Sequence, residues 1–378
     1  MAWNKTPSIQ TKKPTAPAYF KWLSAIGIAI FFLIYFLYTN TNNELSHQKK
    51  WVNIIIVVCP LLIITITFLC RLLVYIKKKG YYDFLEKEKL YADKQWEQWG
   101  SRSMSVLKSV LFLPQKITLP YMLKHQSQHT ARYKIPQKID YLSNEKSCCF
   151  YLLRTVQDKV IQLSNQSPFH IQYLTKKNVD LAKNELTSSW EKLFPNVDIP
   201  NFDITDTLSY GFIESAIKDN ENIIELILIE QPYTQEQSAI LSVIIITTDD
   251  IAKSHHLETI ANIKRPMPID TDENHQIAID LFPEIQTESH NATHTFSDGK
   301  CPTSLFTALY QSDNTIMKIS PNTLIDLEFF IGPTGEYSSW FNMALAVEFV
   351  SQYKKTSLTL SQEPNRMFIG TITPSQSI

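Results

Sequence analysis

Cysteine thiols are the first residues of this chain whose chemistry could define an activity. Cys301 opens an expected helix in DGKCPTSLFTALYQ, and Cys148 and Cys149 stand side by side in CCFYLL. A cysteine attacks as its thiolate, which an imidazole, another cation or a helix N-terminus must stabilise. CCFYLL lacks the small residues that usually surround such a nucleophile. We therefore expect core or surface thiols, with their reactivity left open.

A histidine pair is the second candidate. His290 and His294 in HNATH are spaced as i and i+4, which would place both rings on one face of a helix and could bind zinc. The surrounding Asn, Ala, Thr and Ser indicate a loop, and no HExxH glutamate is present. We expect no metal site, no cofactor site and no catalytic residue.

A glycine turn is the third candidate. In LEFFIGPTGEYSSWFNMALAVEFV (327–350) an apolar strand runs into Gly-Pro-Thr-Gly and then a helix, where many α/β enzymes hold a phosphate or a reactive group. Only eight of the 378 residues are glycine, against a usual share of roughly 7%. Because backbone that cradles phosphate normally needs glycine, this scarcity argues against nucleotide enzymes.

Charge and length limit the remaining classes. The net charge is −1, from 36 basic and 37 acidic residues that are evenly mixed, so no nucleic-acid partner is expected. A chain of 378 residues can form one large domain or two ordinary ones.

The N-terminal region contains two apolar runs. Residues 22–38 are 17 residues without a charge, and residues 51–70 are 20 residues long. A bilayer core needs about 20 apolar residues, with a range of roughly 17–25. A cleaved signal peptide does not fit, because no small-residue cleavage site follows and a second run comes directly after. The pattern predicts a two-span transmembrane hairpin over 22–76, with the lipid bilayer as a partner.

Lysine and arginine residues predict the orientation of this hairpin. They are concentrated in the tail 1–21 and just after the second run, whereas the connector carries only Lys49 and Lys50. The bias predicts a cytoplasmic tail, a connector outside, and a large cytoplasmic C-terminal domain at a bacterial inner membrane. The cysteines suggest no disulfide framework, which agrees with a reducing compartment.

Residues 77–145 are expected to form a juxtamembrane helix (81–99), a strand (SMSVLKSVLFLP) and a linker or irregular cap (115–145). Trp96, Trp99 and Arg102 are a candidate partner surface. Packing of the tryptophans onto the domain behind them is the other interpretation.

From residue 146 to 378 helical and strand patterns alternate. Two near-continuous apolar strands, 222–230 and 238–248, indicate a sheet covered on both faces, so the predicted class is α/β. The order strand, Gly-x-x-Gly turn, Ala-rich helix, strand, strand at the C-terminus resembles the end of thiolase-like domains, the fold of β-ketoacyl synthases. The strand pair IIELILIE and SAILSVIIITT resembles the pair that closes the other half.

The thiolase-like resemblance implies acyl chemistry by a cysteine with histidines, one of which follows the first glycine of the turn. Here that position is Pro333, which has no titratable group. Cys301 lies too late in the chain to match the nucleophile. The resemblance therefore implies a degenerate fold, a pseudoenzyme.

A second resemblance is carried by QWEQWGSRSMSVLKSVLFLP (95–114), which is similar to a juxtamembrane segment of inner-membrane adaptors encoded with type VI secretion effectors. It implies protein binding, with a secretion effector as the partner. The leading hypothesis is a membrane-anchored, non-catalytic adaptor or chaperone. The alternative is a membrane-anchored enzyme acting on acyl or lipid-linked substrates. An immunity or sensor protein is a third, which the short connector 39–50 disfavours.

Overall fold

The structure is a computed structural model. It describes residues 3, 5, 11–41, 47–125, 134–142, 146–164, 167–219, 223–270, 275–301, 305–307, 309, 323–364 and 366–375. The chain divides into two compact units. One is Thr6–Gln95, and the other combines Met1–Lys5 with Trp96–Ile378.

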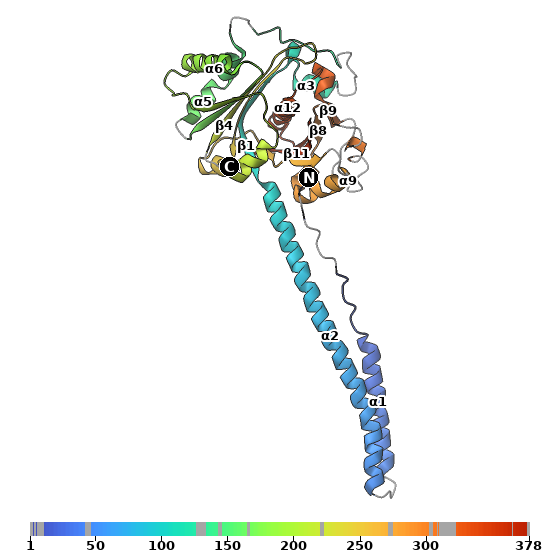
Figure 1. Cartoon of the computed structure of the whole chain (residues 1–378). Coiled ribbons are helices and arrows are strands. Elements are labelled where there is room, and N and C mark those ends of the chain that lie inside the picture. The colour runs from blue at the N-terminus through green and yellow to red at the C-terminus, as the bar shows by residue number, and fades with distance from the viewer. Residues whose placement is uncertain are drawn as a thin grey trace. The chain divides into compact units, whose positions relative to one another are not determined.

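The first unit contains α1 (Tyr19–Thr41) and most of α2 (His47–Ser101), which lie side by side (Figure 1). The Tyr19 and Trp22 rings lie 6.4 and 5.7 Å from the Phe68 ring. The start of α1 therefore meets the second half of the apolar part of α2, and the two helices run antiparallel. The less exposed positions follow spacings of three and four, which defines one packed seam on each helix. They include Trp22, Ala25, Ile26, Ala29 and Leu33 on α1, and Val58, Leu61, Ile64, Thr65, Phe68, Leu72 and Tyr75 on α2.

Among the described residues, one helix is long and apolar enough to cross a membrane, over Val58–Ser101. The apolar part of α1, Tyr19–Tyr35, is shorter. Many apolar side chains outside the seam are exposed, for example Phe20 at 88% and Leu73 at 66%. Such exposure suits lipid far better than water.

The second unit is built on one sheet of 11 strands in the order β3-β2-β4-β5-β1-β6-β11-β10-β8-β9, with β7 paired to β11. The strands are β1 (Ser103–Phe112), β2 (Phe169–Thr175), β3 (Asn201–Thr205), β4 (Ile224–Gln231), β5 (Ile240–Thr248), β6 (Ala261–Lys264), β7 (Met267–Asp270), β8 (His294–Ser297), β9 (Leu324–Asp326), β10 (Ser357–Glu363) and β11 (Arg366–Pro374).

Two halves of this sheet repeat one pattern. In the first half β2 is parallel to β3 and β4, and β4 is antiparallel to β5. In the second half β8 is parallel to β9 and β10, and β10 is antiparallel to β11. The central strands β1 and β6, which pair with each other, join the halves. The unit is therefore an internal duplication at the level of topology.

Helices cover the sheet in three layers (Figure 1). The middle layer holds α12 (Ser338–Tyr353) and α7 (Phe212–Asp219), packed between side chains of both halves. One outer layer holds α4 (Cys148–Thr155), α5 (Gln157–Ser164), α6 (Val179–Leu193) and α8 (Asp249–Ser254). The other holds α9 (His275–Ile285) and helical residues 305–307 and 309. Further helices are α3 (Leu119–Lys124), α11 (Leu327–Ile331) and the 3₁₀ turns Pro114–Lys116 and Thr287–Asn291.

The apolar run of β4 shows why its sequence has no polar face. Ile227 and Ile229 face the middle layer, whereas Leu226 and Leu228 face the outer one. Successive strand residues point to opposite faces, so a strand covered on both sides must be apolar at nearly every position. The α/β layered class predicted from this pattern is confirmed.

Several expected elements take a different form. The spacing of apolar residues in CCFYLLRTVQDKVIQLSN predicts one helix over 148–165, whereas the structure divides this segment into α4 and α5 around Val156. LIDLEFF is a strand only to Asp326, whose side chain accepts the Glu328 N–H and starts α11. Residues from about 265 to 300 form a polar stretch with little periodic pattern in the sequence, yet they contain β7, α9 and β8. The two strands have four residues each, and α9 carries Pro283 inside it.

The boundaries of the second unit also differ from the expected ones. β1 pairs with β5 and β6 at the centre of the sheet, so the unit includes residues well before 146. Parts of the expected linker 115–145 and most of the expected helix CPTSLFTALYQ lie outside the described residues.

Candidate functional site

The Gly-Pro-Thr-Gly turn connects α11 to α12 and is closed by a loop from the other half of the sheet. The Ser238 N–H donates to the Pro333 carbonyl at 2.9 Å, and the Gly335 N–H donates to Gln231 Oε1 at 3.1 Å. The Ser238 hydroxyl also donates to the Ile331 carbonyl at 2.5 Å. The Thr334 N–H donates to Glu328 Oε1 at 2.9 Å, so this N–H and that of Gly335, which an anion would need as donors, are both occupied by side chains of the protein.

Glycine is required at Gly332 for two reasons. Its φ is 78°, a left-handed conformation that other residues rarely adopt. A Cβ at this position would also collide with the Ile135 carbonyl. The first glycine of the turn therefore permits close packing against the segment around Ile135.

A buried carboxylate lies behind the turn, at the end of β8. Asp298 is fully buried, and its Oδ2 accepts from the Gln362 N–H at 2.8 Å and the Ser338 hydroxyl at 3.2 Å. Its Oδ1 accepts from the Lys300 N–H at 3.1 Å. Burial raises the pKa of Asp298 to about 6, against the lowering effects of these bonds and of the Lys300 charge.

The Lys300 ammonium enters the turn itself. Its Nζ donates to the Gly335 carbonyl at 2.6 Å and contacts the Ser338 hydroxyl at 3.1 Å. The carboxylate and the ammonium thus hold the start of α12 between them. We call Asp298, Lys300, Gly335 and Ser338 the turn clasp.

Cys301 lies beside the turn clasp, with its Sγ 3.9 Å from Asp298 Oδ1. Burial, followed by the negative charges of Asp298 and Asp326, raises the pKa of the Cys301 thiol well above its usual range. The neighbours of this thiol therefore favour the protonated, unreactive form.

The other two cysteines lie in the first half, near a network that the sequence did not suggest. Lys177 Nζ lies 2.8 Å from both Glu185 Oε2 and Glu230 Oε1, and the Tyr173 hydroxyl donates to Glu230 at 2.5 Å. Burial, with the Glu230 charge next, raises the pKa of Cys148 to about 12. The same causes raise the pKa of the fully buried Cys149.

A cavity of about 860 Å³ opens beside Cys148. Its lining includes Lys177, Glu230, Tyr151 and Tyr233. Only the placement of Glu230 at the end of an apolar strand could have indicated this polar group from the sequence.

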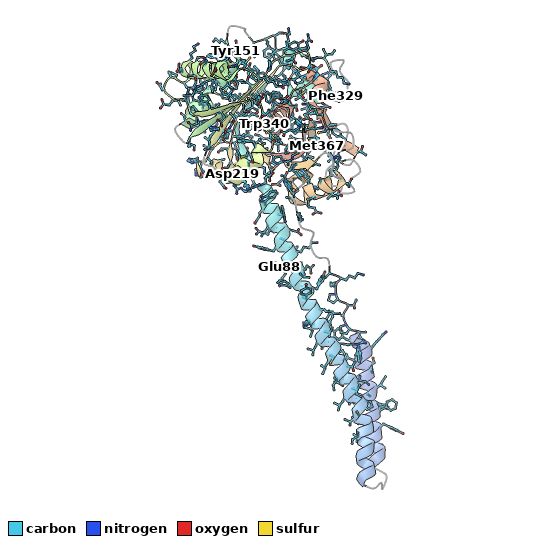
Figure 2. The ribbon with its side chains drawn as sticks, viewed as in Figure 1. Glu88, Tyr151, Asp219, Phe329, Trp340 and Met367 are labelled. Atoms are coloured by element: carbon cyan, nitrogen blue, oxygen red, sulfur yellow. The ribbon has the colours of Figure 1, made fainter. Side chains whose placement is uncertain are left out.

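The two middle helices begin next to each other. The Tyr337 hydroxyl donates to the Asp206 carbonyl at 2.9 Å, and Trp340 Nε1 donates to the Leu208 carbonyl at 2.7 Å. Trp340 lies among the elements of the second unit (Figure 2), and its ring packs edge-on against Tyr210 at 5.8 Å. Aromatic side chains thus fill the space between the two helix starts.

The histidines of HNATH lie in different elements. His290 is in the 3₁₀ turn, and His294 begins β8 with its ring 4.6 Å from Phe349. Burial, followed by the Lys355 charge, lowers the pKa of His294. Within the described part of the chain no group of three or more His, Cys, Asp or Glu side chains is arranged to hold a metal ion, and no hydrogen bond joins a cysteine to a histidine.

The candidate partner surface makes contacts within the second unit. The Trp99 ring lies 5.1 Å from Trp3 and 5.4 Å from Trp96, and the Arg265 guanidinium lies 4.5 Å from its centre. Arg102 forms ion pairs of 3.1 and 2.7 Å with Asp249 and Asp250. Trp96 and Trp99 remain partly exposed, so their role in partner binding stays a prediction.

Comparison with solved structures identifies the fold. A type II polyketide-synthase ketosynthase in complex with its acyl-carrier protein matches 72% of this chain and 99% of its own, with a TM-score of 0.50 and 10% identity. The ishigamide ketosynthase/chain length factor covers 72% of this chain (TM-score 0.48, 8% identity), as does OleA of Xanthomonas campestris (0.43, 9%). No family model matches the chain, and no curated protein matches its sequence. The second unit therefore has a thiolase-like, ketosynthase-type fold, and at this identity the likeness extends to the fold alone.

Proposed function

We propose that this protein is a membrane-anchored, non-catalytic thiolase-like protein that binds another protein as an adaptor or chaperone. The turn clasp carries the proposal. The groups that converge at the start of α12 are the Asp298 carboxylate, the Lys300 ammonium and the Ser338 hydroxyl, and they bond to one another and to the backbone. A site whose polar groups are used for packing has no free acid, base or nucleophile for a substrate.

The thiols support the same interpretation. A thiol with a pKa of about 12, such as Cys148, is thiolate at pH 7.5 only to a fraction on the order of 10⁻⁴ or less. The alternative, an enzyme acting on acyl or lipid-linked substrates, would have the cavity beside Cys148 as its natural site. Such an enzyme would need a neighbour that stabilises the thiolate, and the Lys177 charge acts in that direction, but burial and the Glu230 charge outweigh it and raise the pKa of Cys148.

The N-terminus supports a two-span anchor. Trp3 is only 7% exposed and stacks on Phe282 at 5.9 Å, and Lys5 lies 3.2 Å from Glu284. Residues 3 and 5 therefore pack in the same unit as the C-terminal domain. A segment whose two ends lie on one side of a membrane crosses it an even number of times, so if α2 spans the bilayer between residues 5 and 96, α1 spans it as well.

The matching lengths of the helices fit such a hairpin. The contact between Trp22 and Phe68 leaves about 20 residues of each helix between it and the connector, or roughly 30 Å at 1.5 Å per residue. The lysines around both ends favour the cytoplasmic side of a bacterial inner membrane for the tail and the large unit. We propose Trp96, Trp99 and Arg102 as part of the partner surface and a type VI secretion effector as the partner.

Site-specific photocrosslinking in cells tests the proposal. A benzophenone amino acid at position 96 should crosslink one defined protein, and the same group at the exposed position 91 should not. Replacement of Cys148, Cys149 and Cys301 by alanine should leave that crosslink unchanged. Loss of the crosslink in a folded triple variant, or equal capture from both positions, would contradict the adaptor role.

A further inference from the structure

A basic groove runs between the N-terminal linker and α2, wholly within the first unit. Residues 11–18 lie along one wall and α2 residues 70–82 along the other, around a volume of about 990 Å³. The lining contains four cationic side chains, Lys12, Lys13, Arg71 and Lys78, and no aspartate or glutamate. The groove therefore has a strongly positive potential.

The helix wall of the groove is a single stripe. Arg71, Tyr75, Lys78 and Tyr82 all line the groove and are spaced as i, i+4, i+7 and i+11, so they lie on one face of α2. Arg71 and Lys78 are about 10 Å apart along the axis at 1.5 Å per residue. The stripe alternates a cation with a tyrosine, a pattern suited to a headgroup with its ester oxygens.

The four cations have few internal partners. Arg71 lies 5.5 Å over the Trp22 ring, which leaves its N–H groups able to donate. Among the described residues no hydrogen bond or ion pair is found for the ammonium groups of Lys12, Lys13 or Lys78. A cluster of unpaired cations costs repulsion, which a bound anion would relieve.

The position of the groove along α2 indicates which anion. The apolar run ends at Cys70, and the next residue is Arg71, so the groove begins where the hydrocarbon would end. Clusters of four or more basic residues immediately cytoplasmic of a spanning helix bind anionic headgroups. We propose that this groove binds the phosphate headgroup of an anionic phospholipid. This inference rests on the proposed membrane anchor.

Native mass spectrometry of the full chain tests the proposal. The protein is released from nanodiscs that contain equal amounts of phosphatidylglycerol and phosphatidylethanolamine, and the bound lipids are counted. The wild type should retain phosphatidylglycerol selectively. Each cation near an anionic membrane surface strengthens binding by about fivefold. The variant Arg71→Gln/Lys78→Gln removes two of them and should therefore reduce that selectivity by at least tenfold. The conservative variant Arg71→Lys/Lys78→Arg should keep most of it.

The control variant is Lys87→Gln/Lys89→Gln, which removes the same charge from exposed positions of α2 outside the groove. It should bind lipid as the wild type does. An equal loss of lipid selectivity in the groove and control variants, or no loss in either, would overturn the proposal that the groove binds the lipid. Displacement of the lipid by millimolar inorganic phosphate would show a free-anion site instead and would also overturn it.

Carbonate extraction of membranes separates this inference from the anchor on which it rests. If the protein stays in the membrane pellet and the groove variants keep their lipid selectivity, the groove alone is refuted. If the wild type is extracted into the supernatant, both the membrane anchor and lipid binding in the groove are refuted.

Discussion

Replacing Lys300 with methionine tests whether the turn clasp holds the start of α12. The change keeps a chain of similar length and removes the ammonium that donates to the Gly335 carbonyl and contacts Ser338. It also leaves the buried Asp298 carboxylate without its nearby positive charge. A hydrogen bond made by a charged group contributes roughly 1.5–3 kcal/mol, and the change removes two of them. Because Lys300 is only partly buried, we expect about 3 kcal/mol at pH 8.

The stability lost in Lys300→Met should depend on pH, and the titration of Asp298 determines the direction of this dependence. Burial raises its pKa from 3.8 to about 6, so between these values the native state binds more protons than the unfolded state. Its contribution to stability is present below pH 3.8 and is lost as the pH rises through about 6. Without Lys300 the pKa rises further, and the loss of stability between pH 5 and pH 8 becomes larger than in the wild type.

Urea unfolding of the full chain in mild detergent, followed by tryptophan fluorescence at pH 5 and pH 8, measures both effects. Lys183→Met is the control, since Lys183 is exposed on α6, and it should change stability by less than about 0.5 kcal/mol. The turn-clasp interpretation would be refuted if Lys300→Met matched this control, or if its loss were the same at both pH values.

Three further predictions concern other positions. Asp326→Asn keeps the acceptor for the Glu328 N–H and removes a carboxyl whose pKa burial raises to about 7. The variant should be more stable than the wild type, and the gain should be larger at pH 8 than at pH 5. Equal gains at both pH values in the same urea assay would contradict this. Gly332→Ala should lower the free energy of unfolding by about 3 kcal/mol or more, because of the positive φ and the nearby Ile135 carbonyl. The control Gly80→Ala has open space around it in a helix and should be neutral or stabilising by up to about 1 kcal/mol. Similar melting temperatures for the two variants would exclude the proposed packing at Gly332. Trp3→Ala should lower the free energy of unfolding by about 2 kcal/mol. This is less than the ~3–5 kcal/mol expected for a central core tryptophan, because only a short terminal segment detaches. The variant should also expose the N-terminal tail to protease, and unchanged proteolysis would mean that Trp3 is not docked.

Strong local patterns were sufficient for much of the fold. The apolar face of α6, from Ala182 to Leu193, is buried as its spacing of three and four predicts, and Asn178 caps it. β4, β5, β10 and β11 were recognisable because an apolar run between polar turns has few other uses. These signals are carried by neighbouring residues and need no knowledge of the rest of the chain.

Elements that depend on distant pairing were not predictable in the same way. β1 has a strand pattern, but its place between β5 and β6 depends on partners such as Leu241 and Lys264, which lie far along the chain. The three residues of β9 are too few to show a period, although Asp326 ahead of Glu328 was a legible helix cap. β7 has only four residues, and α9 contains Pro283, which obscured its helical pattern.

In the candidate site, too, features set by neighbouring residues could be predicted from the sequence, and features set by distant residues could not. The sequence alone shows that Pro333 in the Gly-Pro-Thr-Gly turn has no titratable group, because this concerns one residue in a local motif. The turn clasp is not, since Asp-Gly-Lys is a common surface turn and only the burial of Asp298 by Gln362 and Ser338 gives it a structural role. The same holds for Lys177, which meets Glu230 through the pairing of β2 with β4.

Intact-protein mass spectrometry after incubation with an acyl-pantetheine thioester tests the central claim most directly. The protein in its nanodisc would be mixed with the thioester at pH 7.5 and followed for a covalent acyl adduct, with parallel iodoacetamide labelling mapped to Cys148, Cys149 and Cys301. We predict no acyl adduct and alkylation of all three thiols no faster than that of free glutathione. An acyl group on any one of them, lost in its alanine variant, would show that the thiolase-like fold has kept a working nucleophile.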